Sequence, residues 1–123
     1  MILLFHPFEP PSGNDFHKRH WSEYARHKAF CRTWAVFTHR SRGYKKIMAR
    51  CAVDFVTYRR RLLDDDNMIT GLKGLRDSLV EAGFLYDDSP KWATFTYVQK
   101  KRDASPYGNV GTEISIALLQ DVV

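Results

Sequence analysis

The sequence predicts a small α+β domain in which one mixed β-sheet carries two helices. The chain has 123 residues, which is enough for a single compact domain spanning residues 1–123 but leaves little room for a second. Of these residues 44% are hydrophobic and 27% are charged, a balance typical of globular proteins. Strand-like and helix-like patterns follow in the order β-α-β-α-β-β, which favours one sheet with both helices on the same face.

The first half of the chain predicts a strand, a loop and a helix. Residues 1–8 are apolar enough for a strand, and the prolines and glycine of EPPSGND, residues 9–15, predict a loop. From Ser22 to about Thr38, apolar residues recur on one helical face, with Ser22 as a candidate N-cap. RSRGYKK, residues 40–46, predicts a basic connection.

Three further strands are predicted in the second half. CAVDFVTY, residues 51–58, is β-branched and aromatic and is the clearest of them. Its alternate residues are expected to share one face of the sheet: Cys51, Val53, Phe55 and Thr57. Residues 92–99 and 112–119 predict two more strands, joined by the turn-rich KRDASPYGNVG.

Between these strands the pattern changes to that of a helix. Leucine and methionine recur every three to four residues from about Asp65 to Ala82, which predicts an amphipathic helix ended by Gly83. FLYDDS, residues 84–89, is apolar before its acids, and we expect it to return as a short strand beside residues 51–58.

The net charge of +5 is unevenly distributed. Residues 17–61 hold 13 Lys and Arg against two acids, whereas residues 62–90 hold seven acids against two cations. The basic half suggests a polyanionic partner such as DNA, although a basic surface that only aids solubility is equally compatible with the charge alone. The acids beside it would repel phosphate unless a cation lay between them.

Other features narrow the class of protein. No apolar run approaches the roughly 20 residues that a membrane span needs. The opening MILLF leads into Pro7 and resembles a strand more than a signal peptide. Cys31 and Cys51 give no disulfide framework, and we expect a reduced, intracellular protein.

The stretch RRRLLDDDN, residues 59–67, holds the candidate metal ligands. In an extended entry to the helix, Asp64 and Asp66 would point to the same side, and Asp65 would point away, free to cap the helix or face solvent. A returning strand would bring Asp88 to them. Gathered carboxylates repel one another unless a divalent cation joins them, and oxygen ligands suit Mg²⁺. The alternative is an acid-rich helix start, which the helix dipole favours by roughly 0.3–1 kcal/mol.

Lys73 and a group of histidines are two further candidates for functional residues. Lys73 lies about two turns beyond Asp66, where it could stabilise charge on a scissile phosphate, or could simply pair with Asp77 four residues later. His17, His20, His27 and Cys31 suggest a transition metal, but no CxxC or HExxH spacing accompanies them, so zinc is disfavoured. No Walker loop or nucleophile elbow is present.

The stretch RRRLLDDDNMITGLKGLRDSLVEAGFLYDDSP, preceded by EPPSGN and HKRHW, resembles the RusA-type Holliday junction resolvases. That family shows basic residues, D-x-D-N, a helix with a lysine, and a distal D-D pair. The resemblance implies a homodimeric, Mg²⁺-dependent endonuclease, for which Mn²⁺ can substitute. Such an enzyme nicks branched DNA, in particular four-way junctions, symmetrically during recombination and repair. It also implies a phage or bacterial origin and a cytoplasmic location.

The resemblance assigns roles to individual residues. Asp64, Asp66 and Asp88 match the metal ligands and catalytic acids. Lys73 matches the catalytic lysine only with a three-residue insertion near residues 69–71, because the family's lysine follows the asparagine by three residues. The residues expected to contact DNA are Arg59, Arg60, Arg61, Lys45, Lys46, Arg42, Lys18 and Arg19.

Two alternatives to this function stay open. A DNA-binding protein without catalytic activity could use the same scaffold, with the acids only capping a helix. A metal-dependent enzyme acting on a small phosphorylated substrate is disfavoured by the breadth of the basic region.

Overall fold

The computed structural model describes residues 1–18 and 21–119. Its elements in chain order are β1 (Ile2–His6), α1 (Gly13–Lys18), α2 (Trp21–Ser41), β2 (Cys51–Arg59), α3 (Asp65–Gly71), α4 (Lys73–Ala82), β3 (Ala93–Lys101), the 3₁₀-helix η1 (Arg102–Ala104) and β4 (Gly111–Leu118).

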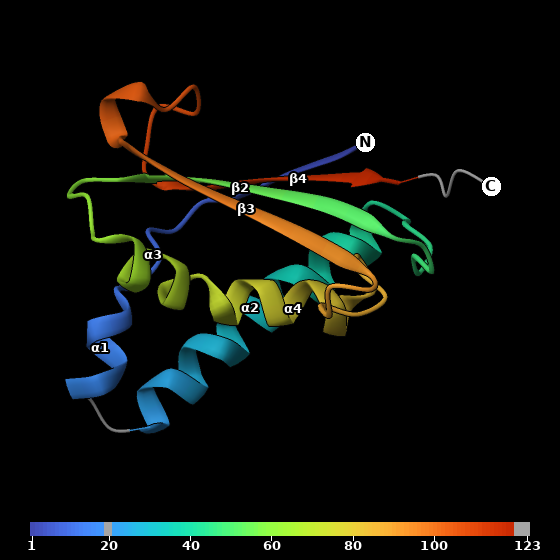
Figure 1. Ribbon diagram of the computed structural model, residues 1–123, viewed down its shortest axis with the longest axis horizontal. Coiled ribbons are helices and arrows are strands. Elements are labelled where there is room, and N and C mark those ends of the chain that lie inside the picture. Colours follow the sequence, from blue (N-terminus) through green and yellow to red (C-terminus); the bar gives the residue numbers. More distant parts are fainter. Residues whose placement is uncertain (19–20, 120–123) are drawn as a thin grey trace.

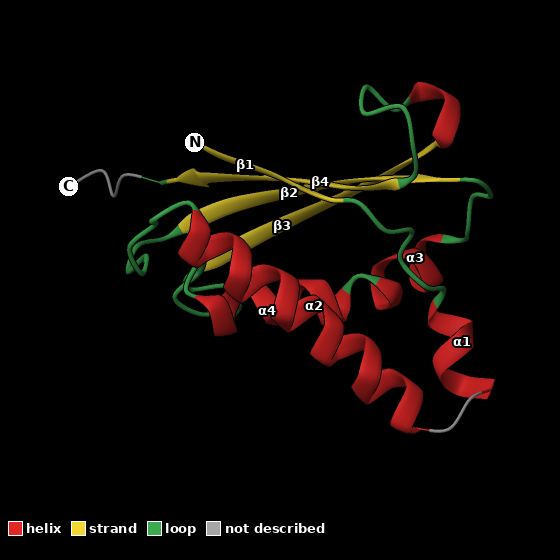
Figure 2. Ribbon diagram, turned by 180° about the vertical axis from the view of Figure 1, so that it is seen from behind, coloured by secondary structure: helices red, strands yellow, loops and turns green. Residues whose placement is uncertain are grey.

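The four strands form one mixed sheet in the order β1-β4-β2-β3, which confirms the predicted α+β class. β4 pairs antiparallel with both β1 and β2, whereas β2 and β3 are parallel. A parallel pair needs a crossover connection, and α3 and α4 supply it. The helices α1 to α4 lie on one side of the sheet, and the short η1 lies on the other (Figures 1 and 2).

The core lies between the inner face of the sheet and helices α2 and α4. The alternation predicted for β2 is confirmed, because Cys51, Val53, Phe55 and Thr57 are all buried. α4 adds Leu75 and Leu79, and α2 adds Cys31 and Ala35. Both cysteines are free, and burial raises the pKa of Cys31 to about 12, so this thiol stays protonated and unreactive.

No helix of the described residues is long and apolar enough to cross a membrane.

The described residues contain four α-helices where two were expected, and α1 is the first difference. It begins at Gly13, inside the predicted loop 9–15. The amide of Ser12 donates to the Asp15 carboxylate at 3.1 Å, and the amide of Asn14 donates to Ser12 Oγ at 3.2 Å. These reciprocal bonds are those of a capping box, so the S-x-x-D spacing was a helix signal that the prolines obscured.

The second difference is that the helix predicted from Asp65 to Ala82 is broken at Leu72. Gly71 ends α3 where the chain after β1 crosses it, and a Cβ on Gly71 would stand 1.9 Å from the carbonyl oxygen of Pro11. The amide of Leu72 donates to the Ile69 oxygen at 3.1 Å, a tighter turn than that of an α-helix. The break therefore follows the three residues, 69–71, where the resemblance required an insertion.

The predicted strand at residues 84–89 is wrong. Gly83 ends α4 as expected, with φ 97° in the left-handed region. The amides of Gly83 and Phe84 then donate to the oxygens of Val80 and Leu79 at 3.2 and 2.9 Å, as in a Schellman motif, and the side chains of Phe84 and Leu85 are buried. The apolar residues that are buried in this helix-ending turn were therefore mistaken for a strand. The strand that lies beside β2 in the expected place is β3, which starts at Ala93 and pairs with β2 in parallel.

The crossing at Gly71 predicts a large cost for a single methyl group. We expect Gly71→Ala to lower the free energy of unfolding by about 2–3 kcal/mol, because the clash is with backbone and not with a movable side chain. Urea unfolding measures this. Gly43→Ala is the control: nothing lies within 4 Å of its Cβ, but its φ of 69° carries a conformational cost of about 1 kcal/mol. A Gly71 variant no less stable than the Gly43 variant would contradict the packing described.

Candidate functional site

The candidate site is centred on the acidic turn, residues 64–67, which begins α3. Asp64 is the N-cap: its carboxylate accepts the Asn67 amide at 2.9 Å and the Asn67 side-chain Nδ2 at 3.1 Å. Asp65 and Asp66 are exposed in the first helical turn, and their side chains form no hydrogen bond or ion pair with the described residues. The cap is therefore Asp64, not Asp65.

This geometry corrects one step of the sequence interpretation. Backbone alternation was expected to turn Asp64 and Asp66 to the same side, but the extended segment ends at Asp64, and Asp65 and Asp66 are helical. What keeps the acids together is instead their place within one turn at a helix N-terminus, where the helix dipole stabilises negative charge.

The acidic turn packs against the proline turn, residues 10–14, although about 50 residues separate them in the chain. A Cβ on Gly13 would lie 2.7 Å from Cβ of Thr70 and 3.1 Å from Oδ1 of Asn67, and Gly71 lies as close to Pro11. The two segments that carry the resemblance are thus in contact at the end of the molecule where α1 and α3 meet (Figure 1).

Arg59 fastens this contact and is not available to DNA, contrary to the prediction. Its side chain is 6% exposed; Nη1 donates to the Pro10 oxygen, and Nε donates to the Arg61 oxygen at 3.3 Å. Nη2 also lies 3.7 Å from the Glu9 carboxylate. Burial lowers the pKa of Arg59, and the negative charges of Glu9 and Asp15 oppose that shift.

The other predicted DNA contacts do not form one surface. Arg60 and Arg61 are exposed next to the acidic turn, with Arg60 Nε 2.9 Å from the Glu9 carboxylate. Arg42, Lys45 and Lys46 are exposed as well, but they precede β2. The nine residues of β2 span about 30 Å, so the two basic groups lie at opposite ends of that strand.

Two of the predicted contacts cannot be placed. Arg19 lies outside the described residues, and of Lys18 only the backbone, at the end of α1, is described.

Lys73 is exposed at the first position of α4, and its side chain forms no ion pair with the described residues. The alternative, a pair with Asp77, is not formed among the described residues, and Asp77 lies 3.7 Å from Lys28 of α2. The side chain of Lys73 is therefore free to meet a phosphate.

Asp88 is not gathered with the other two predicted ligands. It lies in the turns after α4, with Oδ2 3.9 Å from Arg76 Nε. Arg76 itself donates to the Tyr97 hydroxyl at 3.2 Å and lies over the Phe95 ring at 5.3 Å. Within residues 1–18 and 21–119, no three His, Cys, Asp or Glu side chains are arranged to hold a metal ion.

Of the histidine site that the sequence disfavoured, only the His27 and Cys31 side chains can be placed. Nε2 of His27 lies 3.6 Å from Sγ of Cys31, and burial lowers the pKa of His27. His20 and the His17 side chain lie outside the described residues.

Gln99 of β3 is a site residue that the sequence interpretation missed. Its side-chain amide accepts from the Leu63 amide at 3.0 Å and donates to the Leu63 oxygen at 2.5 Å. These two bonds hold the backbone of Leu63, the residue immediately before Asp64, against the end of β3. The sequence carries no signal for it, because a single polar residue in a strand is ordinarily a solvent-facing one.

A comparison with models of known protein families gave no match, and a search of curated proteins also gave none.

The Gln99 contact predicts a pH-dependent variant. In Gln99→Glu a carboxylate would face the Leu63 oxygen, whereas the protonated acid can donate as the amide does. The folded state thus raises the pKa of this glutamate, and its stabilising bond is present at low pH and lost as pH rises. We expect Gln99→Glu to lose about 1–3 kcal/mol at pH 7 by urea unfolding, and markedly less at pH 4.5.

Gln99→Leu, which cannot form either bond, is the control. Its loss relative to the wild type should be the same at both pH values. Parallel pH dependence of the two variants would show that the contact does not hold Leu63 as described.

Proposed function

We propose that this protein is a Mg²⁺-dependent endonuclease that nicks branched DNA. The observation that carries the proposal is the contact between the proline turn and the acidic turn, in which Asp66 is exposed and has no partner among the described residues, a few residues along the chain from the exposed Arg60 and Arg61. Carboxylates next to exposed arginines suit a site where a metal ion must meet a phosphodiester. The RusA-type resemblance covers the same two segments.

The donor set fits Mg²⁺ in part. Asp64 and Asp66 offer carboxylate oxygens within one turn, and Mg²⁺ in proteins is commonly held by one or two carboxylates, with water and substrate phosphate completing the shell. Asp88 as placed contributes nothing, and its role as a third ligand is part of the proposal. Mn²⁺ has the same oxygen preference. When bound, the ion would polarise the scissile phosphate and activate a water.

Other side chains around the acidic turn would bind the DNA backbone and stabilise the charge that develops on the phosphate. Arg60 and Arg61 would bind backbone phosphates on either side of the cut, which positions DNA without reading its sequence. Lys73, exposed and without a partner in the described part of the chain, would neutralise charge that develops on the phosphate. Asp64, fixed by Asn67, would give the ion one ligand of defined orientation.

Junction resolution adds a requirement of symmetry. A four-way junction is nearly two-fold, so paired nicks in opposing strands need two copies of the site related by a two-fold axis. This part of the proposal rests on the resemblance and on the geometry of the substrate.

One observation favours the alternative of a DNA-binding protein without catalytic activity. Both carboxylate oxygens of Asp64 are occupied by Asn67, as a purely structural cap would require. The two functions differ in one measurable respect, since only the nuclease nicks DNA when Mg²⁺ is supplied.

Asp66→Asn tests the proposed activity directly. We expect the wild type to nick a labelled four-way junction in Mg²⁺ but not in EDTA, and the variant to nick at least 100-fold more slowly, because it loses a charged metal ligand. Junction binding, measured by gel shift, should be unchanged or stronger. Asp65→Asn is the matched control and should retain nicking within a fewfold. An uncut junction in the wild type, or equal rates in both variants, would contradict the proposal.

Asp88→Asn tests the third ligand separately. If Asp88 joins the site in the DNA complex, the variant loses nicking at least tenfold and needs more Mg²⁺ for half-maximal rate. Asp87→Asn, in the adjacent position, should titrate with Mg²⁺ as the wild type does. An Asp88 variant with wild-type metal dependence would restrict the ligands to Asp64 and Asp66.

A further inference from the structure

The edge strand β3 and the residues on either side of it carry a run of positive charge. Among the described strands, β3 pairs only with β2, so it forms one edge of the sheet. Residues 89–102, which we call the basic edge, hold no acid and four cations: Lys91, Lys100, Lys101 and Arg102. All four are exposed and form no ion pair with the described residues. None of them was predicted to contact DNA.

The charge of the basic edge is gathered at its two ends. Lysines along an edge strand can serve only to prevent pairing with other chains. Here, however, residues 93–99 carry no charge, and the cations flank them on both sides. The arrangement therefore consists of two separate positive groups joined by a neutral strand, which prevention of strand pairing does not require.

The first group continues into the connection that precedes β2. The Cys51 amide donates to the Trp92 oxygen at 2.9 Å, which brings the end of this connection, residues 42–50, to the start of β3. The connection holds four cations and no acid. Two of its lysines are exposed and form no ion pair with the described residues: Lys45 and Lys46. This group lies at the end of the sheet opposite α3 (Figure 1).

The second group lies beside the acidic turn. Lys101 is the register partner of Arg59 at the end of the β2–β3 pair, and the side chain of Gln99 holds the residue that precedes the acidic turn. Lys100 and Lys101 are therefore close to the candidate nuclease site. The nine residues of β3 extend about 30 Å, which is the separation of the two groups of cations.

This separation suits about one turn of duplex DNA. A duplex rises about 3.4 Å per base pair, so the two groups are about 9 base pairs apart, close to the full turn of about 10. Each DNA strand faces the same side once per turn, so its phosphates can reach both groups. Between them, Asp54 is exposed on β2, and its carboxylate accepts from Thr96 Oγ1 at 2.5 Å. Contact at the two ends leaves this acid opposite the part of the turn where that strand has rotated away.

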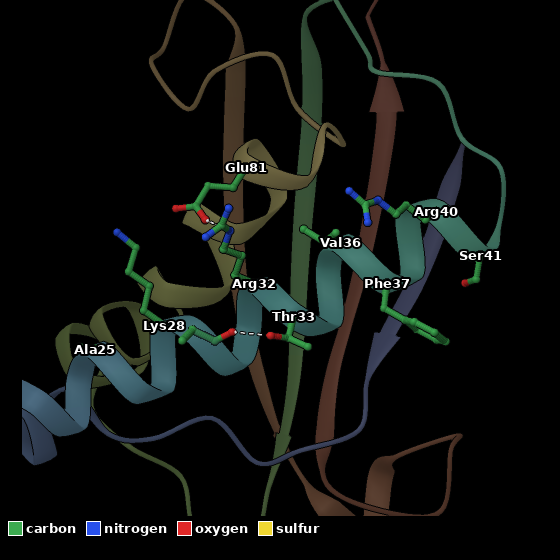
Figure 3. Close-up of a pocket in the computed structure, with 10 residues that line it drawn as sticks. Ala25, Lys28, Arg32, Thr33, Val36, Phe37, Arg40, Ser41 and Glu81 are labelled. Carbon is green, nitrogen blue, oxygen red and sulfur yellow. Dashed lines mark hydrogen bonds and ion pairs between the residues drawn. The ribbon is translucent and has the colours of Figure 1, made fainter.

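A second basic surface lacks such free charge. A groove of about 860 Å³ runs along α2, and two of the three cations that line it are paired within the protein. Arg32 Nε lies 3.1 Å from the Glu81 carboxylate (Figure 3), and Lys28 lies 3.7 Å from Asp77. Cations that are already neutralised gain less from phosphate, so this groove provides a matched comparison for the basic edge.

We propose that the basic edge binds one turn of a duplex arm of the branched DNA. Lys100 and Lys101 bind phosphates next to the cut, and Lys45 and Lys91 bind phosphates about one turn away. These contacts are made to the backbone and do not read sequence. The inference rests on the proposed function for its substrate, and it adds the surface along which an arm lies and the length of arm that full affinity requires.

The salt dependence of binding tests these cations. Binding of a labelled four-way junction is measured by fluorescence anisotropy in EDTA, where no nicking is expected, over a range of KCl concentrations. Each phosphate contact contributes about 0.9 to the slope of log Kd against log salt. Lys45→Ala/Lys91→Ala and Lys100→Ala/Lys101→Ala should therefore each lower that slope by about 2.

Lys28→Ala/Arg32→Ala is the control, because it removes the same formal charge from the groove of α2. It should keep the wild-type slope, and circular dichroism should show all three variants folded. Slopes that are equal in all four proteins, or lowered as much in the control as in the basic-edge variants, would overturn the proposal.

Arm length tests the spacing. Junctions whose arms are capped by hairpin loops are compared at arm lengths of about 14 and about 6 base pairs, of which only the longer reaches the far group. The wild type should bind the short-armed junction about tenfold more weakly. Lys45→Ala/Lys91→Ala should bind both junctions equally, because it has already lost the contact that a short arm lacks. Lys100→Ala/Lys101→Ala should be weakened on both.

A wild type that is indifferent to arm length, or a Lys45→Ala/Lys91→Ala variant as sensitive to it as the wild type, would overturn the proposal. These outcomes are separable from those of the nuclease assay. Nicking in Mg²⁺ together with binding that ignores arm length would refute the basic edge and leave the nuclease intact. Binding that depends on arm length as described, without nicking in Mg²⁺, would support the basic edge and refute the nuclease.

Discussion

The structure around the candidate site depends on one buried cation. Arg59, at the end of β2, donates to the backbone oxygens of Pro10 and Arg61 and lies beside Glu9. Leaving a buried charge without its partners costs about 3–5 kcal/mol, so these bonds hold the proline turn firmly where β2 leaves the sheet. Pro11 of the proline turn contacts Gly71. This contact breaks the crossover into two helices and determines where α3 ends. The position of the acidic turn is therefore fixed from both of its sides, by Arg59 before it and Gly71 after it.

The sequence predicted the elements whose local pattern and tertiary role agree. β2 alternates as expected because one face of it is buried, and Gly83 ends α4 because glycine alone tolerates its left-handed φ. The predictions from sequence were wrong where a contact between residues far apart in the chain determines the local structure. Leu72 has good helix propensity, yet α3 stops before it because Pro11 crosses there, and no local signal reports that crossing. Phe84 and Leu85 are apolar because they cover the end of the core, not because they belong to a strand.

Within the candidate site, the acids were easier to find than their surroundings. A cluster of short acids before a helical pattern marks the start of a helix, although the sequence interpretation offered Asp65 as the cap and the structure has Asp64 in that place. Arg59 could not be separated from Arg60 and Arg61 by composition, although it is buried and they are not. Gln99 was invisible because a polar strand residue ordinarily faces solvent. What distinguishes these residues is the neighbour that each one meets, and that depends on how the sheet pairs.

The predicted metal ligands differ in how strongly neighbouring residues hold their side chains, and Asp88 is held weakly. Its contact with Arg76 is 3.9 Å long at a partly exposed position, and such pairs contribute at most about 1 kcal/mol. Arg76 also donates to the Tyr97 hydroxyl and lies over the Phe95 ring, but its buried Nε has no hydrogen-bond partner, and Asp88 is its ion-pair partner among the described residues. Asp64, by contrast, is held by two hydrogen bonds from Asn67. Asp66 forms no hydrogen bond or ion pair with the described residues, so Asp64 is the one predicted ligand whose side chain is firmly oriented by a neighbour.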